Sequence, residues 1–242
     1  MITPRFSILP QKRHRLLKNR HGTEIYNNWS GAAIYSATNI VMNTIEATWT
    51  IPNTFPLVAA TDGIWYSASA WIGLDGDGNS TDIIQAGCDS DLMIANGVIS
   101  RQTTPWWEWY PGDTVGINNF AVALGDTVNC LIGMSSVTGA TIYFHNLTSG
   151  TAETFAAALP PGVKLTGNCA EWIVEALELG STSPMLARYG GIFFNECNCG
   201  NNAGIVQSLS DASVISMNDP SGKIISTGEV KLPNLLCVAY TG

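Results

Sequence analysis

Short runs of β-branched and aromatic residues, separated by turn residues, predict a chain built of strands. Clear examples are residues 40–42, 47–51, 67–72 and 128–132. Thr138-Gly139 and Ser149-Gly150 separate three further runs, which indicates consecutive hairpins. Because such runs recur about every 8–12 residues, we expect an all-β fold, either an antiparallel sandwich or a barrel.

Residues 170–179 are compatible with two kinds of element. Their composition favours a helix, whereas the alternation of apolar and acidic residues favours a strand. Both periodicities place Glu171 and Glu175 on the same face. The two carboxyl groups are therefore expected to face the same surroundings.

Charge divides the chain into two parts. The first 20 residues hold six of the 11 basic residues and no acidic residue. Residues 21–242 then carry 5 basic and 19 acidic side chains, a net charge of 5 − 19 = −14. No repeat or linker divides the rest, so we predict a basic arm or pro-segment over residues 1–22 and one domain over residues 23–242.

Composition excludes several classes of protein. Apolar residues make up 45% of the chain and charged residues 12%, which excludes a disordered chain or a coiled coil. No apolar run approaches the ~20 residues of a membrane span, so we expect no membrane partner. The acidic body disfavours nucleic acid, because phosphates require a basic surface.

The residues of the chain give little support for a metal site or for nucleophilic catalysis that depends on histidine. Of three histidines, two lie in or beside the arm, and only His145 is left for the body. Residues 75–79 imitate the start of a calcium loop, but the later ligand positions do not match, and a turn is the better interpretation. We expect no metal and no cofactor. The six cysteines are interpreted as buried thiols or as one or two disulfides.

Polar chemistry gathers at three places within apolar surroundings. Gln85 interrupts an apolar strand, where an unpaired amide costs about 1–3 kcal/mol, so a partner is implied. Glu108 lies among aromatic residues, and Glu171 and Glu175 lie in the later segment. Aromatic surroundings disfavour the charged form of a carboxyl group and raise its pKa, which suits proton transfer.

These residues alone leave three classes of function open. One is an acid–base hydrolase that acts on a polymer. The second is a catalytically silent β-sandwich that binds carbohydrate or protein through a Trp-lined groove. The third is a glycoside hydrolase that uses Glu108 and Glu175 as paired carboxylates, which requires a suitable separation of the two groups.

The chain resembles the eqolisin-type glutamic peptidases, a family of acid endopeptidases. Five motifs in the family's order carry the resemblance: NWSGA at 28–32, AWIGLDGD at 70–77, IQAG at 84–87, WEWYP at 107–111 and AEWIVE at 170–175. The resemblance implies a lectin-like β-sandwich of two packed antiparallel sheets. It also implies polypeptide substrates, insensitivity to pepstatin and an extracellular location, although no leader is visible in this sequence.

The resemblance assigns roles to residues of this chain. It implies a catalytic dyad of Gln85 and Glu175, in which the glutamate activates a water molecule and the glutamine stabilises the oxyanion. Asp75 and Glu108 are implied to support the dyad. Groups expected to bind substrate are Trp29, Trp71 and, as a secondary candidate, Glu171.

The arm and the assembly state complete the expectations. Precursors of the family carry a basic pro-segment, and residues 1–22 resemble a short version that would act as an intramolecular inhibitor. Attraction between the arm and the acidic body weakens as carboxylates become protonated. We expect a monomer. Asp219-Pro220, an acid-labile type of bond, suggests an activity optimum that is only moderately acidic.

Overall fold

The fold is all-β. A computed structural model describes residues 6–9, 23–57, 60–77, 80, 82–136, 139–163, 165–177 and 185–242. These residues form strands β1 to β18 and a single 3₁₀ turn, η1 (Leu209–Asp211), without an α-helix. No helix in this part of the chain is long and apolar enough to cross a membrane. The all-β prediction is therefore confirmed.

One sheet, called sheet I, carries most of the sequence motifs. Its strands pair in the order β1, β9, β8, β7, β6, β13, β3, β16 and β2. Their bounds are β1 (Phe6–Ile8), β9 (Val115–Ile117), β8 (Val98–Tyr110), β7 (Ile83–Ala95), β6 (Ser69–Asp75), β13 (Cys169–Glu175), β3 (Trp29–Tyr35), β16 (Ser213–Asn218) and β2 (Thr23–Tyr26). Neighbours run antiparallel except for β16 and β2, which run parallel.

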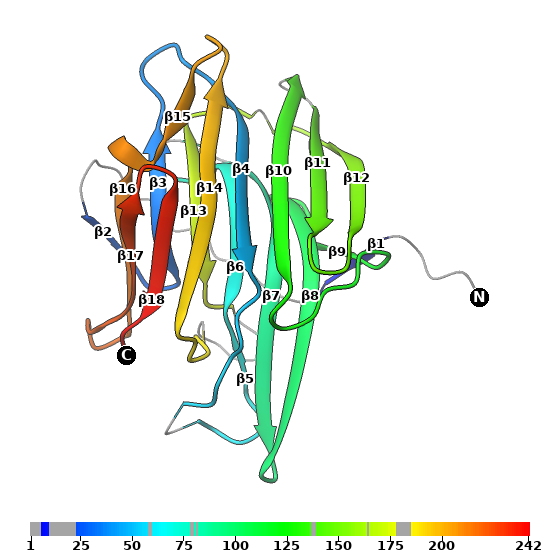
Figure 1. The fold of residues 1–242 in the computed structure, drawn as a ribbon, viewed down its shortest axis with the longest axis vertical. Helices are drawn as coiled ribbons and strands as arrows, with labels where there is room; N and C mark the ends of the chain where they lie inside the picture. The colour runs from blue at the N-terminus through cyan, green and yellow to red at the C-terminus, as the bar shows by residue number, and fades with distance from the viewer. Residues whose placement is uncertain are drawn as a thin grey trace.

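Sheet II packs against sheet I and forms the front layer in Figure 1. Its order is β12, β11, β10, β4, β14, β18 and β17. Their bounds are β12 (Thr151–Ala158), β11 (Gly139–Asn146), β10 (Thr127–Ser136), β4 (Met42–Thr50), β14 (Gly191–Asn201), β18 (Leu235–Tyr240) and β17 (Ile224–Leu232). The strands β5 (Trp65–Ser67) and β15 (Val206–Ser208) extend the sheets beside β7 and β14. Pairing of β16 with β17 joins the two sheets at one side.

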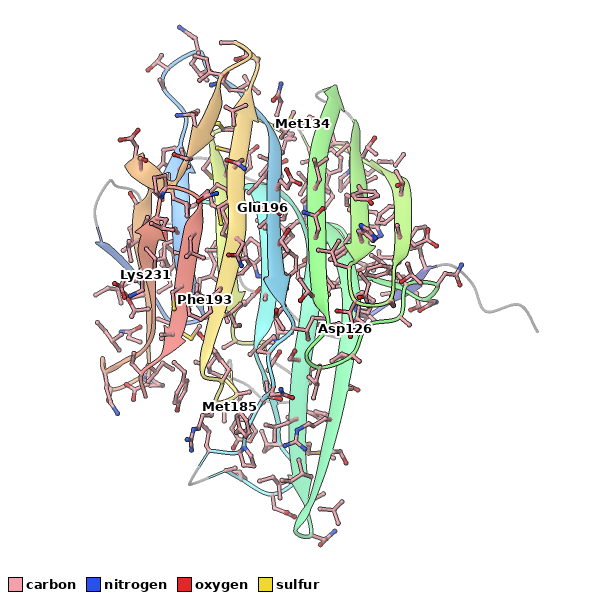
Figure 2. The ribbon with its side chains drawn as sticks, in the orientation of Figure 1. Asp126, Met134, Met185, Phe193, Glu196 and Lys231 are labelled. Carbon is pink, nitrogen blue, oxygen red and sulfur yellow. The ribbon has the colours of Figure 1, made fainter. Side chains whose placement is uncertain are left out.

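The main core fills the space between the sheets. Its largest members are aromatic side chains that are at most 1% exposed: Trp49, Trp109, Phe144, Trp172 and Phe194. Burying such rings is the main favourable contribution to folding. The opposite face of sheet II is partly exposed to solvent, where β14 presents Phe193 and Glu196 toward the viewer in Figure 2.

The outer face of sheet I holds a second apolar cluster. Alternation along β13 places Trp172 in the core between the sheets and Ile173 on the outer face. Trp29, Trp71 and Trp106 lie in the same outer cluster as Ile173, and each is at most 2% exposed. The outer face of an antiparallel sheet is commonly solvated, whereas this outer face is buried.

The ambiguous segment is resolved as strand β13, which lies between β3 and β6. Ladder bonds on both sides override the local helix preference, since tertiary pairing outweighs propensity. All six cysteines are free thiols and buried, and burial raises the pKa of each thiol, to about 12 at Cys199. Of the predicted arm, only residues 6–9 are among the described residues, and the rest of that prediction lies outside them.

Replacing Gly31 by alanine is expected to destabilise the fold. Gly31 has a φ of 154°, and a Cβ there would lie 2.0 Å from the carbonyl oxygen of Trp172 on β13. Because both atoms belong to rigid paired strands, we expect a loss of about 3 kcal/mol or more in the free energy of unfolding. Urea denaturation measures this loss. Gly190→Ala is the matched control, since nothing lies within 4 Å of a Cβ there. Equal midpoints for the two variants would contradict the prediction.

Candidate active site

The predicted site residues share the outer face of sheet I. Register places Glu171 opposite Gly73, Gly73 opposite Gln85, and Gln85 opposite Glu108. A second row runs from Glu175 to Ser69 on β6, four residues from Gly73. Four residues are two steps of the strand alternation, so both rows face the same way.

Gln85 and Glu108 are brought together directly. The Nε2 of Gln85 donates a hydrogen bond to the Oε2 of Glu108 at 2.9 Å, and the two residues are 2% and 4% exposed. The Oε1 of Gln85 is buried and accepts no hydrogen bond from the described residues. The partner implied by sequence is therefore Glu108.

Glu175 is held from two sides. The indole Nε1 of Trp71 donates to its Oε2 at 3.0 Å, and the Nδ2 of Asn28 donates to its Oε1 at 3.4 Å. The ring of Trp71 meets that of Trp29 edge to face, with centroids 5.1 Å apart. The Glu175 carboxylate is fully buried, so these donors determine its orientation.

Gln85 and Glu175 lie two strands apart, with β6 between them. Two strand spacings amount to about 10 Å across the sheet, and the row of Glu175 lies a further four residues, or about 13 Å, along the strands from the row of Gln85. The side chain of Gln85 bonds to Glu108 rather than to Glu175. Gly87 lies between the two rows, and a Cβ there would come within 2.4 Å of the Cβ of Trp71. The missing side chain at this position leaves room for the tryptophan whose indole reaches Glu175.

Asp75 binds backbone N–H groups just before β13. Its carboxylate accepts hydrogen bonds from the backbone N–H groups of Thr166, Gly167 and Asn168, the residues just before β13. Burial raises the pKa of Asp75, and these N–H donors oppose that rise. Asp75 thus fixes the start of the strand that ends at Glu175.

Glu171 is buried apart from Glu175. It is fully buried, its Oε1 accepts from the Sγ of Cys169 at 3.2 Å, and its Oε2 has no partner among the described residues. Burial, and then the neighbouring charge of Asp77, raise the pKa of Glu171 well above its usual range. The structure does not place Glu171 beside Glu175, so its predicted contact with substrate stays a prediction.

Three polar residues of the site were not singled out from sequence. Asn28 contacts Glu175 and was visible only as the first residue of a motif. Ser69 lies opposite Glu175, and its hydroxyl donates to Asp89 at 2.5 Å. Both Ser69 and Asp89 are fully buried. A buried aspartate four residues after Gln85 is a signal that alternation alone could have supplied.

A second polar cluster borders the site. The hydroxyl of Tyr35 lies within hydrogen-bonding distance of both Glu24 and Asp77, and the hydroxyl of Tyr26 donates to Glu24 at 2.8 Å. Burial raises the pKa of Glu24 to about 7, the charge of Asp77 adds to this rise, and the tyrosine hydroxyls oppose it. Glu24 was not predicted, because the distant strands β2 and β6 bring it to Asp77.

Among the residues that the structure describes, no group of three or more His, Cys, Asp or Glu side chains is arranged to hold an ion. The arrangement offers carboxyl and amide groups, which support proton transfer and hydrogen bonding.

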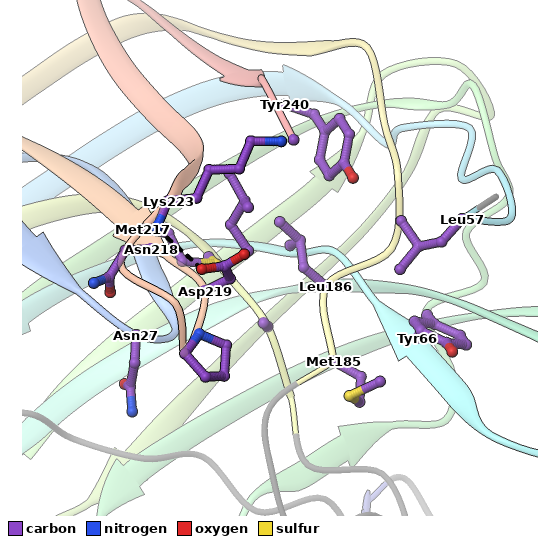
Figure 3. A pocket seen from close by; sticks show the side chains of 14 residues that line it. Asn27, Leu57, Tyr66, Met185, Leu186, Met217, Asn218, Asp219, Lys223 and Tyr240 are labelled. Carbon is purple, nitrogen blue, oxygen red and sulfur yellow. Dashed lines mark hydrogen bonds between the residues drawn. The ribbon is translucent and has the colours of Figure 1, made fainter. Parts of the chain in front are cut away.

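An apolar cavity of about 480 Å³ lies beyond the end of β13 (Figure 3). Ala176 lines it together with Tyr66, Met185, Leu186 and Tyr240. Neither Gln85 nor Glu175 is among the residues that line it. The polar outer face of sheet I, rather than this cavity, therefore defines the candidate active site.

Comparison with known proteins identifies the class that this fold and site define. Residues 27–240 match the model of the Peptidase A4 family. Aspergillopepsin-2 from Aspergillus niger is 29% identical over 67% of this chain, and scytalidopepsin B from Scytalidium lignicola is 25% identical over 81%. The matched segments span 56% and 72% of those two relatives.

Solved structures agree with the fold. A scytalido-glutamic peptidase with a transition-state analogue inhibitor matches with a TM-score of 0.73 and 22% identity, covering 89% of this chain and 98% of its own. The aspergilloglutamic peptidase from Aspergillus niger matches with a TM-score of 0.63 and 28% identity, covering 73% of this chain and 99% of its own. The predicted β-sandwich is confirmed.

The chain belongs to the Peptidase A4 family, the eqolisin-type glutamic endopeptidases. This confirms the family that the five motifs indicated and the predicted enzyme class. It favours a peptidase over the carbohydrate-binding and glycosidase alternatives.

The cluster around Glu24 is expected to make the fold more stable in acid than at neutral pH. The pKa of Glu24 rises from 4.5 to about 7, so the folded chain holds a proton that the unfolded chain releases. This contribution to the free energy of unfolding is fully present below pH 4.5 and is lost as the pH rises through about 7.

The measurement is the melting temperature between pH 4 and 8. The melting temperature of Glu24→Gln should fall less steeply with rising pH than that of the parent chain. Asp211→Asn, at an exposed position, is the control and should follow the parent. Parallel curves for Glu24→Gln and the parent would refute the assignment.

Proposed function

We propose that this chain is an acid endopeptidase that cleaves polypeptides with a dyad of Gln85 and Glu175. The observation that carries the proposal is the fully buried Glu175 carboxylate, oriented by Trp71 and Asn28 on the same face as Gln85. Membership of the Peptidase A4 family supports it.

In the proposed reaction, the Glu175 carboxylate takes a proton from a water molecule. The water oxygen forms a bond to the scissile carbonyl carbon, and the carbonyl oxygen takes up the electron pair as an oxyanion. The N–H of Gln85 that does not bond to Glu108 donates to this oxyanion. Glu175 then gives the proton to the amide nitrogen, the C–N bond breaks, and an acid and an amine are released.

The surrounding groups serve this step by positioning. Glu108 fixes the rotamer of Gln85, and Trp71 and Asn28 fix that of Glu175. Trp29 packs against Trp71 and lines the face on which a substrate would lie. We propose that Trp29 and Trp71 contact substrate side chains, and that Asp75 holds the approach to β13.

The N-terminal arm is proposed to act as an intramolecular inhibitor. Residues 6–8 form β1 at the β9 edge of sheet I, and Leu9 packs against the outer cluster. Thr23 begins β2 at the opposite edge of the same sheet. Most of the basic stretch lies in sequence between these two strands. The family match over residues 27–240 supports one peptidase domain after this arm.

An extracellular location and a monomeric state remain proposals. The two curated relatives come from fungi, Aspergillus niger and Scytalidium lignicola. The low share of charged residues and the acidic body fit a protein that works in acid, where protonated carboxyl groups reduce self-repulsion.

Substitutions at the dyad are expected to abolish turnover without unfolding the chain. Glu175→Gln keeps the size of the side chain but removes the base, and Gln85→Ala removes the oxyanion donor. Each should lower kcat by about 10³-fold or more. The assay is hydrolysis of denatured casein or haemoglobin from pH 2 to 7 with pepstatin present. Glu229→Gln, at a 64% exposed side chain, is the control. Activity retained in Glu175→Gln would exclude the dyad.

Acid is expected to release the arm. Protonation of the body's carboxylates weakens the attraction for the six cations of residues 1–20. Incubation near pH 3–4 followed by mass spectrometry should show loss of residues 1–22 as activity appears. High salt at neutral pH should weaken the same attraction by screening it. A fully active chain that keeps residues 1–22 would refute the inhibitory role.

A further inference from the structure

The edge of sheet I beside β9 is built to receive an extended polypeptide. β1 pairs antiparallel with β9, with Phe6 opposite Ile117, Ser7 opposite Gly116 and Ile8 opposite Val115. The N–H of Leu9 continues the ladder by donating to the carbonyl oxygen of Thr114 at 2.9 Å. Without this segment, β9 would present an unpaired row of backbone groups, which is a template for strand addition.

Side chains of β1 are recognised on both faces of the sheet. Toward the core, the ring of Phe6 lies 5.1 Å from that of Phe155 and 6.2 Å from that of Trp107, edge to face in both cases. Aromatic pairs in this geometry add about 0.5–1.5 kcal/mol beyond burial. By contrast, Ile8 is 69% exposed and makes little contact. The β9 edge therefore contacts the aromatic side chain at position 6 closely and leaves the side chain at position 8 largely in solvent.

Recognition on the outer face depends on Gly116. Alternation places Ser7 and Leu9 on the outer face, where Leu9 packs against the cluster that includes Trp71 and Trp106. A Cβ at Gly116 would lie 3.0 Å from the Cδ2 of Leu9 and 3.2 Å from the Oγ of Ser7. The absence of a side chain at Gly116 thus forms the seat for an aliphatic residue.

The position of Leu9 is level with the row of residues that contains Gln85 and Glu108. Gln85 lies opposite Glu108, and the residue before Glu108, Trp107, lies opposite Val115. Glu108 is therefore level with Thr114, which in turn bonds to Leu9. Leu9 thus lies at the end of the row that holds Gln85. A chain that follows the path of β1 reaches this row from its N-terminal side. The segment before a scissile bond would approach the dyad along the same path.

We propose that the β9 edge, once vacated by the arm, binds the segment of a polypeptide substrate that precedes the cleaved bond. The substrate adds a strand to sheet I, with an aromatic side chain between Trp107 and Phe155 and an aliphatic side chain three residues later over Gly116. This inference rests on the proposed endopeptidase function. It predicts that cleavage is selected by sequence several residues away from the bond.

Direct binding tests the edge without relying on catalysis. The full chain with Phe6→Ala and Leu9→Ala, which weaken its own β1, is titrated by calorimetry at pH 4. One peptide is acetyl-Arg-Phe-Ser-Ile-Leu-amide, and the other has alanine in place of the Phe and the Leu. The first should bind about tenfold more tightly or better, which corresponds to about 1.4 kcal/mol. Equal affinities would overturn the proposal.

Two glycine variants locate the binding. Gly116→Val in the same background should remove the preference for the first peptide. Gly133→Val on β10 is the matched control, since a Cβ there meets only side chains at 3.8 and 4.0 Å, and it should keep the preference. In the acid-activated parent chain, Gly116→Val should raise the KM for denatured casein several-fold, and Gly133→Val should not. Equal behaviour of the two valine variants would overturn the location.

The experiments distinguish a failure of the edge proposal from a failure of the proposed endopeptidase function. Hydrolysis of casein without any selection between the peptides overturns the edge proposal and leaves the proposed function standing. Selection between the peptides without hydrolysis by the arm-free chain refutes the proposed function, and with it the assignment of this edge to a substrate.

Discussion

The two-residue alternation of β13 is the constraint on which the site depends. β13 lies between β3 and β6, so its backbone is bonded on both sides and its register is fully determined. Trp172 and Val174 then fill the core between the sheets, and Glu171 and Glu175 necessarily project from the outer face. A slip of one residue would place two carboxyl groups in the apolar core and move Trp172 to the outer face, which the core could not tolerate. Folding energy thereby positions the proposed catalytic carboxylate.

Burial of many carboxyl groups on one sheet ties stability to acid. Glu24, Asp75 and Glu171 all have raised pKa values, and burial is the first cause in each case. A neutral carboxyl group costs far less to bury than a charged one, so acid relieves a strain that neutral pH imposes. The same protonation would reduce the attraction that is proposed to hold the basic arm. Stability and the proposed release of the arm would then respond to pH in the same direction.

The outer face of sheet I combines two kinds of recognition. Trp29 and Trp71 lie in the apolar cluster beside the proposed dyad, and backbone pairing takes place at the β9 edge, at the end of the row that holds Gln85. Backbone pairing accepts any sequence, whereas pockets for alternate side chains discriminate between sequences. An endopeptidase needs both, because it must bind many chains and still choose a bond. In the structure, residues 6–8 occupy this edge.

The sequence by itself determined the strands, the shared face of Glu171 and Glu175, and the family, because alternation and motifs are local properties of the chain. It also implied that Gln85 needs a partner. Only the tertiary structure identified that partner as Glu108, since cross-strand register joins residues 23 positions apart. The contacts of Asn28 with Glu175 and of Glu24 with Tyr35, and the pairing of β1 with β9, likewise join distant segments. A periodic pattern states which face a side chain takes, but the strand order decides what that face meets.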